Sequence, residues 1–307
     1  VIVTVLLLTE LKHTFTEFAQ RMKNDEMITL AKFLAISGII LPMLPHKNLI
    51  PDINLTPYSI WLATVVVSGI SYLSYLLKRY VFHESGVLVS GIIGGLYSST
   101  ATISVLARKS RKASEQEANE YVAAMLLAVS MMFLRFMILI LIFSREIFTS
   151  IYPYLLIMSV VAAVVAWFIH SRHRRSKDMA DESEDEDSSN PLEFKVALIF
   201  ATLFVVFTVL THYTLVYAGT GGLNLLSFVS GLSDITPFIL NLLQNTGSVA
   251  VLVVVACSMQ AIISNILVNM FYALFFAGKG SKLRPWILGG FGTVIGVNLV
   301  LLLFFYL

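Results

Sequence analysis

The chain has 307 residues, of which 57% are hydrophobic and only 13% are charged. Soluble domains are nearer ~45–50% apolar and ~25% charged, so the composition argues against a soluble domain and predicts a membrane protein. A net charge of +2 is too small to indicate nucleic acid as a partner, and the lone Cys257 excludes an intrachain disulfide framework.

Apolar stretches of membrane-spanning length recur along the chain, each long enough for a ~30 Å hydrocarbon core. Residues 1–9 resemble the tail of a helix, and the charged, amphipathic segment 10–26 is predicted to lie at the membrane interface. Nine complete spans are predicted after it, at 27–45, 57–78, 86–107, 118–144, 151–170, 192–217, 222–243, 247–277 and 284–306. The predicted fold class is all-α. Because the chain opens inside a helix and without Met, we expect 1–56 to be N-terminal helices of a longer protein.

The two halves of the chain echo each other. Gly94–Thr102 (GGLYSSTAT) matches Ser230–Pro237 (SGLSDITP), and Tyr152–Leu155 matches Arg284–Ile287. We therefore predict two four-helix repeats in tandem, repeat A over 57–170 and repeat B over 191–307, joined by a charged cytoplasmic linker at 171–190. Four spans in each repeat predict a parallel duplication, whereas a re-entrant helix pair in place of one span would give an inverted one. Internal repeats are common in secondary transporters, whose substrate path lies between the halves.

Basic residues predict the orientation. Clusters at 108–112 and 172–177 fall on one side of the predicted topology, which the positive-inside rule makes cytoplasmic. Five other basic residues fall on the opposite side and weaken the signal: Lys78, Arg79, Lys279, Lys282 and Arg284. The acidic tract 178–187 is interpreted as a hydrated connector. The alternative, a sensor of divalent cations, needs a ligand geometry that the sequence does not specify.

Asp234 is the only carboxylate near the centre of a predicted span. An ionised Asp at that depth costs ~2.5–3.5 kcal/mol on insertion scales, so it must face protein, water, a cation or a partner. Pro237 removes a backbone donor and frees the carbonyl near Ser233. With Ser233 and Thr236, Asp234 predicts an oxygen-lined cation site in a broken helix. The alternative is a permanent ion pair that locks two helices.

Arg135, in the 118–144 span, is the predicted partner of Asp234, since a buried guanidinium needs an acceptor. The repeat places Asn269 at the position equivalent to Arg135, with Asn265 nearby, and it places Asp234 near the equivalent of Ser98. Arg135, Asn265 and Asn269 are therefore candidates for ion pairing or gating. An anion site on Arg135 remains open.

Ser98, Ser99, Thr100 and Thr102 place four hydroxyls within five residues of one span. Hydroxyls can replace part of a cation's hydration shell, so these residues are candidate ion ligands. They can equally bond back to helix carbonyls or permit close helix packing. If they are ligands, we expect Ser98, Ser99 and Asp234 to share one protein-facing cavity near mid-membrane.

No constellation of a soluble enzyme is present: there is no Walker loop, dinucleotide fingerprint, paired metal-binding His or hydrolase Ser elbow. One Asp is too few carboxylates for an intramembrane hydrolase. The sequence predicts neither catalysis nor a cofactor, and it leaves the identity of any metal unknown.

Four segments carry a resemblance to a known family: Leu41–Pro45, Gly94–Thr102 with Ala107–Arg108, Asn190–Glu193 and Ser230–Asp234. The chain resembles the C-terminal membrane domain (domain of unknown function 4010) of bacterial MgtC/SapB-group proteins. The resemblance implies the bacterial inner membrane and an MgtC-like helical domain ahead of this chain.

The leading functional hypothesis is a secondary ion transporter or channel-like permease, with its path between the repeats. A cation is favoured, with divalent ions and proton coupling among the candidates. The alternatives are a non-transporting scaffold or regulatory subunit of the MgtC type, and an anion path that uses Arg135. The expected partners are the lipid bilayer and an inorganic ion, and a homo-oligomer is left open.

Overall fold

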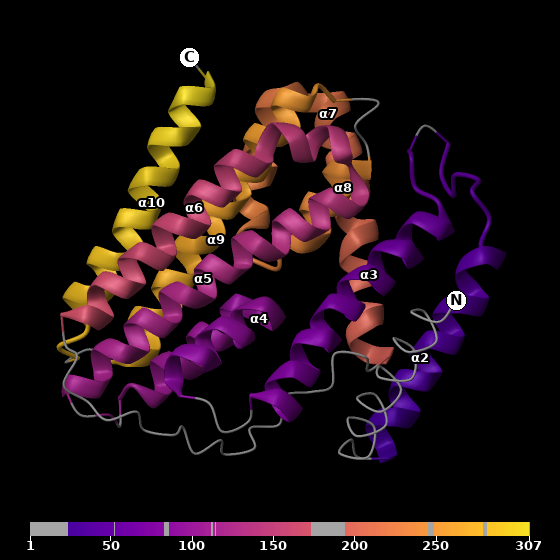
Figure 1. Cartoon of the computed structure of the whole chain (residues 1–307). Coiled ribbons are helices and arrows are strands. Elements are labelled where there is room, and N and C mark those ends of the chain that lie inside the picture. Colours follow the sequence, from indigo (N-terminus) through magenta and orange to yellow (C-terminus); the bar gives the residue numbers. More distant parts are fainter. Residues whose placement is uncertain are drawn as a thin grey trace, which may run out of the picture.

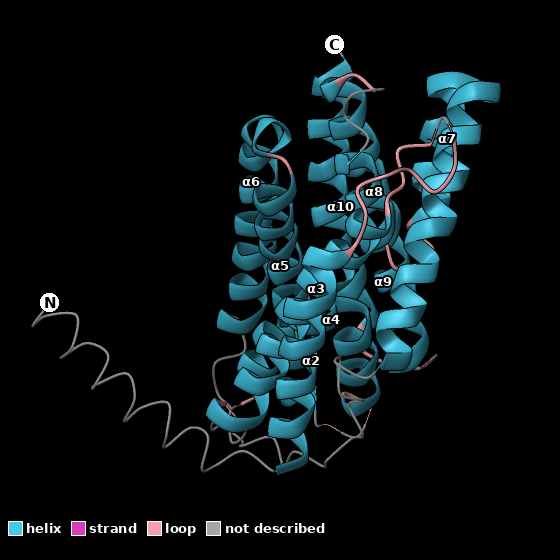
Figure 2. Ribbon diagram, turned by 90° about the vertical axis from the view of Figure 1, so that its right-hand side faces the viewer, coloured by secondary structure: helices cyan, strands magenta, loops and turns pink. Residues whose placement is uncertain are grey.

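The computed structural model describes residues 24–51, 53–82, 86–111, 113, 115–172, 194–244, 249–278 and 281–306. Every regular element in these ranges is helical, so the all-α prediction is confirmed for them (Figures 1 and 2). The elements are α2 (Asn24–Met43), α3 (Pro57–Leu76), the π-helical η1 (Leu77–Val81), α4 (Val87–Lys109), α5 (Glu115–Phe143), α6 (Arg145–Ser171), α7 (Phe194–Ser230), α8 (Thr236–Gln244), α9 (Val251–Ala277) and α10 (Arg284–Tyr306). Residues 1–23 and most of the predicted linker lie outside the described residues.

Within the described ranges, eight helices are long and apolar enough to cross a membrane. Nine spans were expected, and the one predicted at 222–243 is wrong. That stretch is divided between the end of α7 and the nine-residue α8, with a non-helical segment between them. The break has a local cause, because Pro237 lacks an N–H and the Asp234 carboxylate accepts the Thr236 N–H at 3.0 Å.

Helix α4 also does not cross as one rod, because it reverses direction at Ser98. Ser98 has extended backbone angles (φ −160°, ψ 106°) inside an otherwise helical stretch. A Cβ built on Gly94 would lie 2.5 Å from the Thr102 Oγ1, whereas eight residues of continuous helix span ~12 Å. The two halves of α4 therefore lie against each other, as a hairpin confined to one part of the bundle (Figure 1).

A second hairpin is formed by the end of α7 and α8. Gly219 has φ 59°, a left-handed conformation that glycine adopts without strain, and the chain turns back there. Residues 220–230 then run beside α9, where Ser227 Oγ donates to Gln260 Oε1 at 2.7 Å. After the break, α8 returns along the first part of α7, and Asn241 Nδ2 donates to Thr211 Oγ1 at 2.7 Å.

The two hairpins enter the bundle from opposite ends. The second one closes near the start of α3, where Asn54 Nδ2 donates to the Gln244 carbonyl at 3.1 Å. The first closes near the end of α9, where the Arg108 guanidinium stacks 4.4 Å from the Phe276 ring centroid. The tips of both hairpins consequently lie inside the bundle. We call the end with Asn54 and Gln244 the far end, and the end with Arg108 and Phe276 the basic end.

Hairpins in place of two spans change the predicted parity. Full crossings are made by α3, α5 and α6 in the first half, and by the first part of α7, α9 and α10 in the second. With three crossings instead of four, the halves start at opposite ends, so the parallel arrangement predicted for them is wrong. The four-helix repeat itself stays a prediction.

The corrected topology gathers the basic residues. Lys78, Arg79, Lys282 and Arg284, which weakened the predicted orientation, now lie at the same end as the cluster that follows α4. The Lys and Arg residues at the basic end whose side chains the structure describes include Lys78, Arg79, Arg108, Lys109, Arg111, Arg172, Lys282 and Arg284. By the positive-inside rule this end is predicted to face the cytoplasm.

Glycines fix how closely each hairpin packs on its neighbour. A Cβ on Gly95 would lie 2.5 Å from the Ala128 Cα of α5, and a Cβ on Gly231 would lie 2.8 Å from the Ala261 carbonyl oxygen of α9. Both obstacles are backbone atoms, which cannot move without shifting a helix. Small residues at such crossings allow helices to approach closely in membranes.

We predict that Gly95→Ala and Gly231→Ala each destabilise the protein by about 1–3 kcal/mol, the usual cost of overpacking. The measurement is the apparent melting temperature of the purified protein in detergent. Gly69→Ala in α3 is the control, because a Cβ there meets nothing within 4 Å. If all three variants melt together, the hairpins do not pack as described.

Candidate functional site

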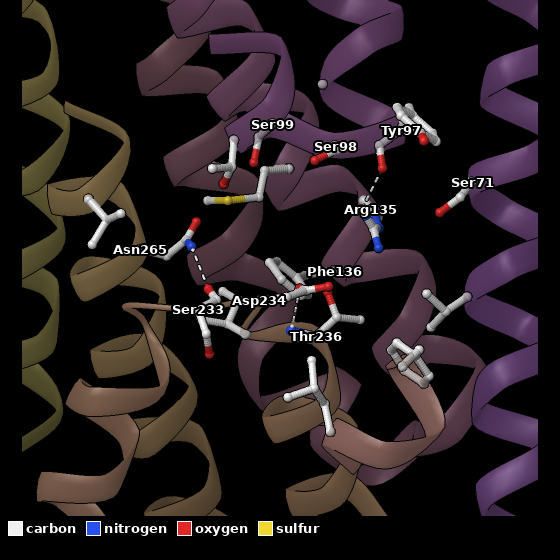
Figure 3. Close-up of a pocket in the computed structure, with 18 of the residues that line it drawn as sticks. Ser71, Tyr97, Ser98, Ser99, Arg135, Phe136, Ser233, Asp234, Thr236 and Asn265 are labelled. Atoms are coloured by element: carbon white, nitrogen blue, oxygen red, sulfur yellow. Dashed lines mark hydrogen bonds between the residues drawn. The ribbon is translucent and has the colours of Figure 1, made fainter. Parts of the chain in front are cut away.

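A cavity of about 490 Å³ lies between the tips of the two hairpins (Figure 3). Helices α3, α5, α7 and α9 form its walls. Its polar lining consists of Ser68, Ser71, Tyr97, Ser98, Ser99, Thr100, Arg135, Ser233, Asp234, Thr236, Asn265 and Tyr272, and the remaining lining residues are mostly apolar.

At the first tip, the broken helix leaves carbonyl groups without helical donors. Arg135 of α5 supplies one donor, since its Nη1 lies 2.9 Å from the Tyr97 carbonyl oxygen. Ser98 Oγ accepts the Ala101 N–H at 3.4 Å and so caps the start of the second half of α4. Figure 3 shows Arg135 reaching the tip beside Tyr97.

At the second tip, an asparagine side chain donates to the freed carbonyl groups. The buried Asn265 of α9 points its Nδ2 at the Gly231 and Ser233 carbonyl oxygens, each at 3.4 Å. Its own Oδ1 accepts Asn269 Nδ2 at 3.1 Å. Asp234 accepts the Thr236 N–H and so caps the start of α8. A neighbouring helix thus donates to the freed carbonyls at each tip.

Arg135 and Asp234 carry opposite charges on one cavity. The Asp234 carboxylate is near enough to attract the Arg135 guanidinium electrostatically. Both residues are described by the structure, but they form no ion pair within 4.0 Å. The Arg135 Nε is completely buried and has no hydrogen-bond partner. The Asp234 side chain is exposed at the cavity. In this conformation, the predicted pairing is replaced by contacts of each charge with backbone.

Eight of the ten predicted site residues line this cavity: Ser98, Ser99, Thr100, Arg135, Ser233, Asp234, Thr236 and Asn265. Thr102 and Asn269 do not. Thr102 lies against Gly94 inside the first hairpin, and Asn269 is buried behind Asn265. Ion binding by any of these residues stays a prediction.

Ser68, Ser71, Tyr97 and Tyr272 line the cavity without having been predicted. The signal for the two serines is their spacing, because residues three apart share one helix face. A single Ser or Tyr in an apolar span is ordinary, so that signal is weak. In the described part of the chain, no group of three or more His, Cys, Asp or Glu residues is placed to hold a metal ion.

Apolar helices of spanning length and a charged internal cavity define a multi-pass membrane protein. The chain belongs to the family described as "Domain of unknown function (DUF4010)", whose model matches residues 65–277. That range contains both hairpins and the whole polar lining of the cavity. The predicted membership in this family is confirmed, while the link to MgtC/SapB-group proteins stays a prediction.

A relative from Aquifex aeolicus (strain VF5), named "Uncharacterized protein", is 27% identical over 221 residues. The match covers 71% of this chain and 94% of the relative. No solved structure matches the chain.

The role of Asn265 in holding the second tip can be tested by removing its amide. We predict that Asn265→Ala lowers stability by about 1–3 kcal/mol, because carbonyl groups of the tip lose their donor. The readout is the apparent melting temperature in detergent. The control is Asn54→Ala, which removes an exposed amide–carbonyl hydrogen bond at the far end. A loss no larger than that of the control contradicts the assignment.

Proposed function

We propose that this protein is a secondary transporter that moves a small charged solute through the cavity between its hairpin tips. The observation that carries the proposal is the meeting of two hairpins from opposite ends at a cavity that holds Arg135 and Asp234. Irregular backbone at membrane depth is tolerated where it lines a cavity or is buried in protein, and broken helices form the substrate sites of many secondary transporters.

We further propose that the two halves are an inverted repeat. Each half consists of one crossing, one hairpin and two further crossings. The two tips lie in the segments whose sequences match, Gly94–Thr102 and Ser230–Pro237. Gly95 on α5 and Gly231 on α9 are the matching close contacts. Inverted repeats support alternating access, because two equivalent halves can exchange conformations around a fixed central site.

The described conformation fits an inward-facing state. Ser71, Val196 and Tyr272 extend the lining of the cavity toward the basic end, near which α3 ends, α7 starts and α9 ends. At the far end, α8 packs against α7 and reaches α3 through Gln244. The basic end is assigned to the cytoplasm, and the membrane is assigned as the bacterial inner membrane.

The charge of the solute follows less directly from the site. Asp234 alone favours a cation, as expected from the sequence, but a cation in this cavity also meets the Arg135 guanidinium. Arg135 alone favours an anion, which in turn meets Asp234. The scaffold alternative gives no reason for placing an exposed carboxylate and an incompletely paired guanidinium on one internal cavity, since both are costly in a membrane.

Transport can be tested by flux into proteoliposomes that contain the purified chain. The panel comprises Na⁺, K⁺, Mg²⁺, Cl⁻, phosphate and mixed amino acids, with and without a pH gradient. We expect Asp234→Asn and Arg135→Gln each to lower the flux of the transported solute at least tenfold. Asp234→Asn should melt near the parent, because the amide has the same shape.

Glu146→Gln and Arg145→Gln are the matched controls, since both parent side chains are exposed at the start of α6, away from the cavity. The proposal fails if no solute of the panel moves, or if flux through the cavity variants equals that of the controls.

The inward-facing assignment predicts one-sided access to the cavity. Ser233→Cys should react with a membrane-impermeant thiol reagent from the basic side and be protected from the far side. The background is low because the single native cysteine, Cys257, is buried. Equal labelling from both sides points to an open channel instead, and labelling from the far side alone reverses the assignment.

A further inference from the structure

We infer that the solute of the central cavity is a small organic zwitterion, whose anionic group binds Arg135 and whose cationic group faces Asp234. This inference rests on the proposed transport function and names its substrate class. It differs from the inorganic ion expected from the sequence. Three features of the cavity carry it: its paired charges, its size and its apolar wall.

The first feature is that each formal charge lacks an ionic partner. The Arg135 Nη1 donates a hydrogen bond to the Tyr97 carbonyl oxygen, whereas its buried Nε has no hydrogen-bond partner. Asp234 receives the Thr236 N–H and is otherwise exposed at the cavity. A ligand with one charge would satisfy one of these groups and be repelled by the other. A ligand with both charges satisfies both, without needing a second ion.

The Asp234 carboxylate lies at the start of α8 and lines the cavity. A carboxylate that accepts a backbone N–H at a helix start is stabilised by that hydrogen bond and by the helix dipole. No Lys or Arg of the described residues lies within ion-pair distance of Asp234, so the positive counter-charge is expected to come from the ligand.

The second and third features are size and wall chemistry. The cavity holds about 490 Å³, which lies within the ~300–1,000 Å³ range of sites for small organic molecules. A bare inorganic ion requires a close shell of oxygen ligands, whereas here Val67, Phe136 and Phe200 form part of the wall. An organic body between the two charged groups would cover that apolar surface.

The test is ligand-induced thermal stabilisation of the purified chain in detergent. The twenty proteinogenic amino acids and glycine betaine are screened first. The best apolar amino acid is then compared with its two single-charge analogues. For leucine these are 4-methylpentanoate, which lacks the ammonium group, and 3-methylbutylamine, which lacks the carboxylate. We expect each analogue to bind at least tenfold more weakly than the zwitterion, which corresponds to ~1.4 kcal/mol or more.

Two variants separate the charges. Asp234→Asn should weaken the zwitterion at least tenfold while binding of 4-methylpentanoate is kept or strengthened, because the repelling carboxylate is gone. Arg135→Gln should likewise weaken binding of the zwitterion at least tenfold, while binding of 3-methylbutylamine is kept or strengthened because the repelling guanidinium is gone. A merely structural role of either residue would weaken all ligands equally and would not exchange their order. Glu146→Gln and Arg145→Gln should keep the parent order.

The inference is overturned if no zwitterion of the screen stabilises the protein, or if a single-charge analogue binds as well as its parent. Stabilisation or flux with inorganic ions alone would also overturn it, while leaving transport intact. Zwitterion binding with the predicted exchange of order, but without flux in proteoliposomes, would instead refute transport and leave the ligand assignment standing.

Discussion

The constraint on which the structure depends is that backbone groups freed at membrane depth must find partners inside the protein. Two helical hairpins end inside the bundle, and each tip exposes carbonyl and N–H groups that a continuous helix would have paired. Arg135 donates to one tip and Asn265 to the other, while Asp234 accepts from the start of α8. Without these side chains, the backbone groups at the broken helices would lack hydrogen-bond partners, and the hairpins would be destabilised.

The same contacts place charge at the cavity. Arg135 lies at the first tip because the Tyr97 carbonyl holds it there, and Asp234 lies at the second because α8 begins there. The two charged groups form no ion pair with each other, so neither is neutralised by the other. The groups that stabilise the tips are thus the groups that give the cavity its chemistry. Movement of either hairpin would change the position of a charge together with the packing.

The sequence predicted helix content and most helix bounds well, because long apolar stretches separated by turn residues leave few alternatives. It also predicted that Ser98, Ser99 and Asp234 share one cavity, since isolated polar side chains in apolar helices must face protein, and all three line the cavity. The first hairpin was missed because α4 has the length and hydropathy of an ordinary span. The helix break at Asp234 was predicted from Pro237, but the return of α8 along α7 was not. Reversal at Ser98 depends on tertiary contacts, namely Gly94 against Thr102 and Gly95 against α5. No periodicity in the sequence reports such contacts.

The two halves of the site differ in a way that bears on its mechanism. At the first tip the donor from the neighbouring helix is a charged guanidinium and the tip residue is Ser98, whereas at the second the donor is a neutral amide and the tip residue is Asp234. Equal halves would place two like charges on the cavity, which repel each other at low dielectric. Unequal halves oppose a cation to an anion across it. The cavity therefore has two chemically different ends, with the Arg135 guanidinium at the first tip and the Asp234 carboxylate at the second.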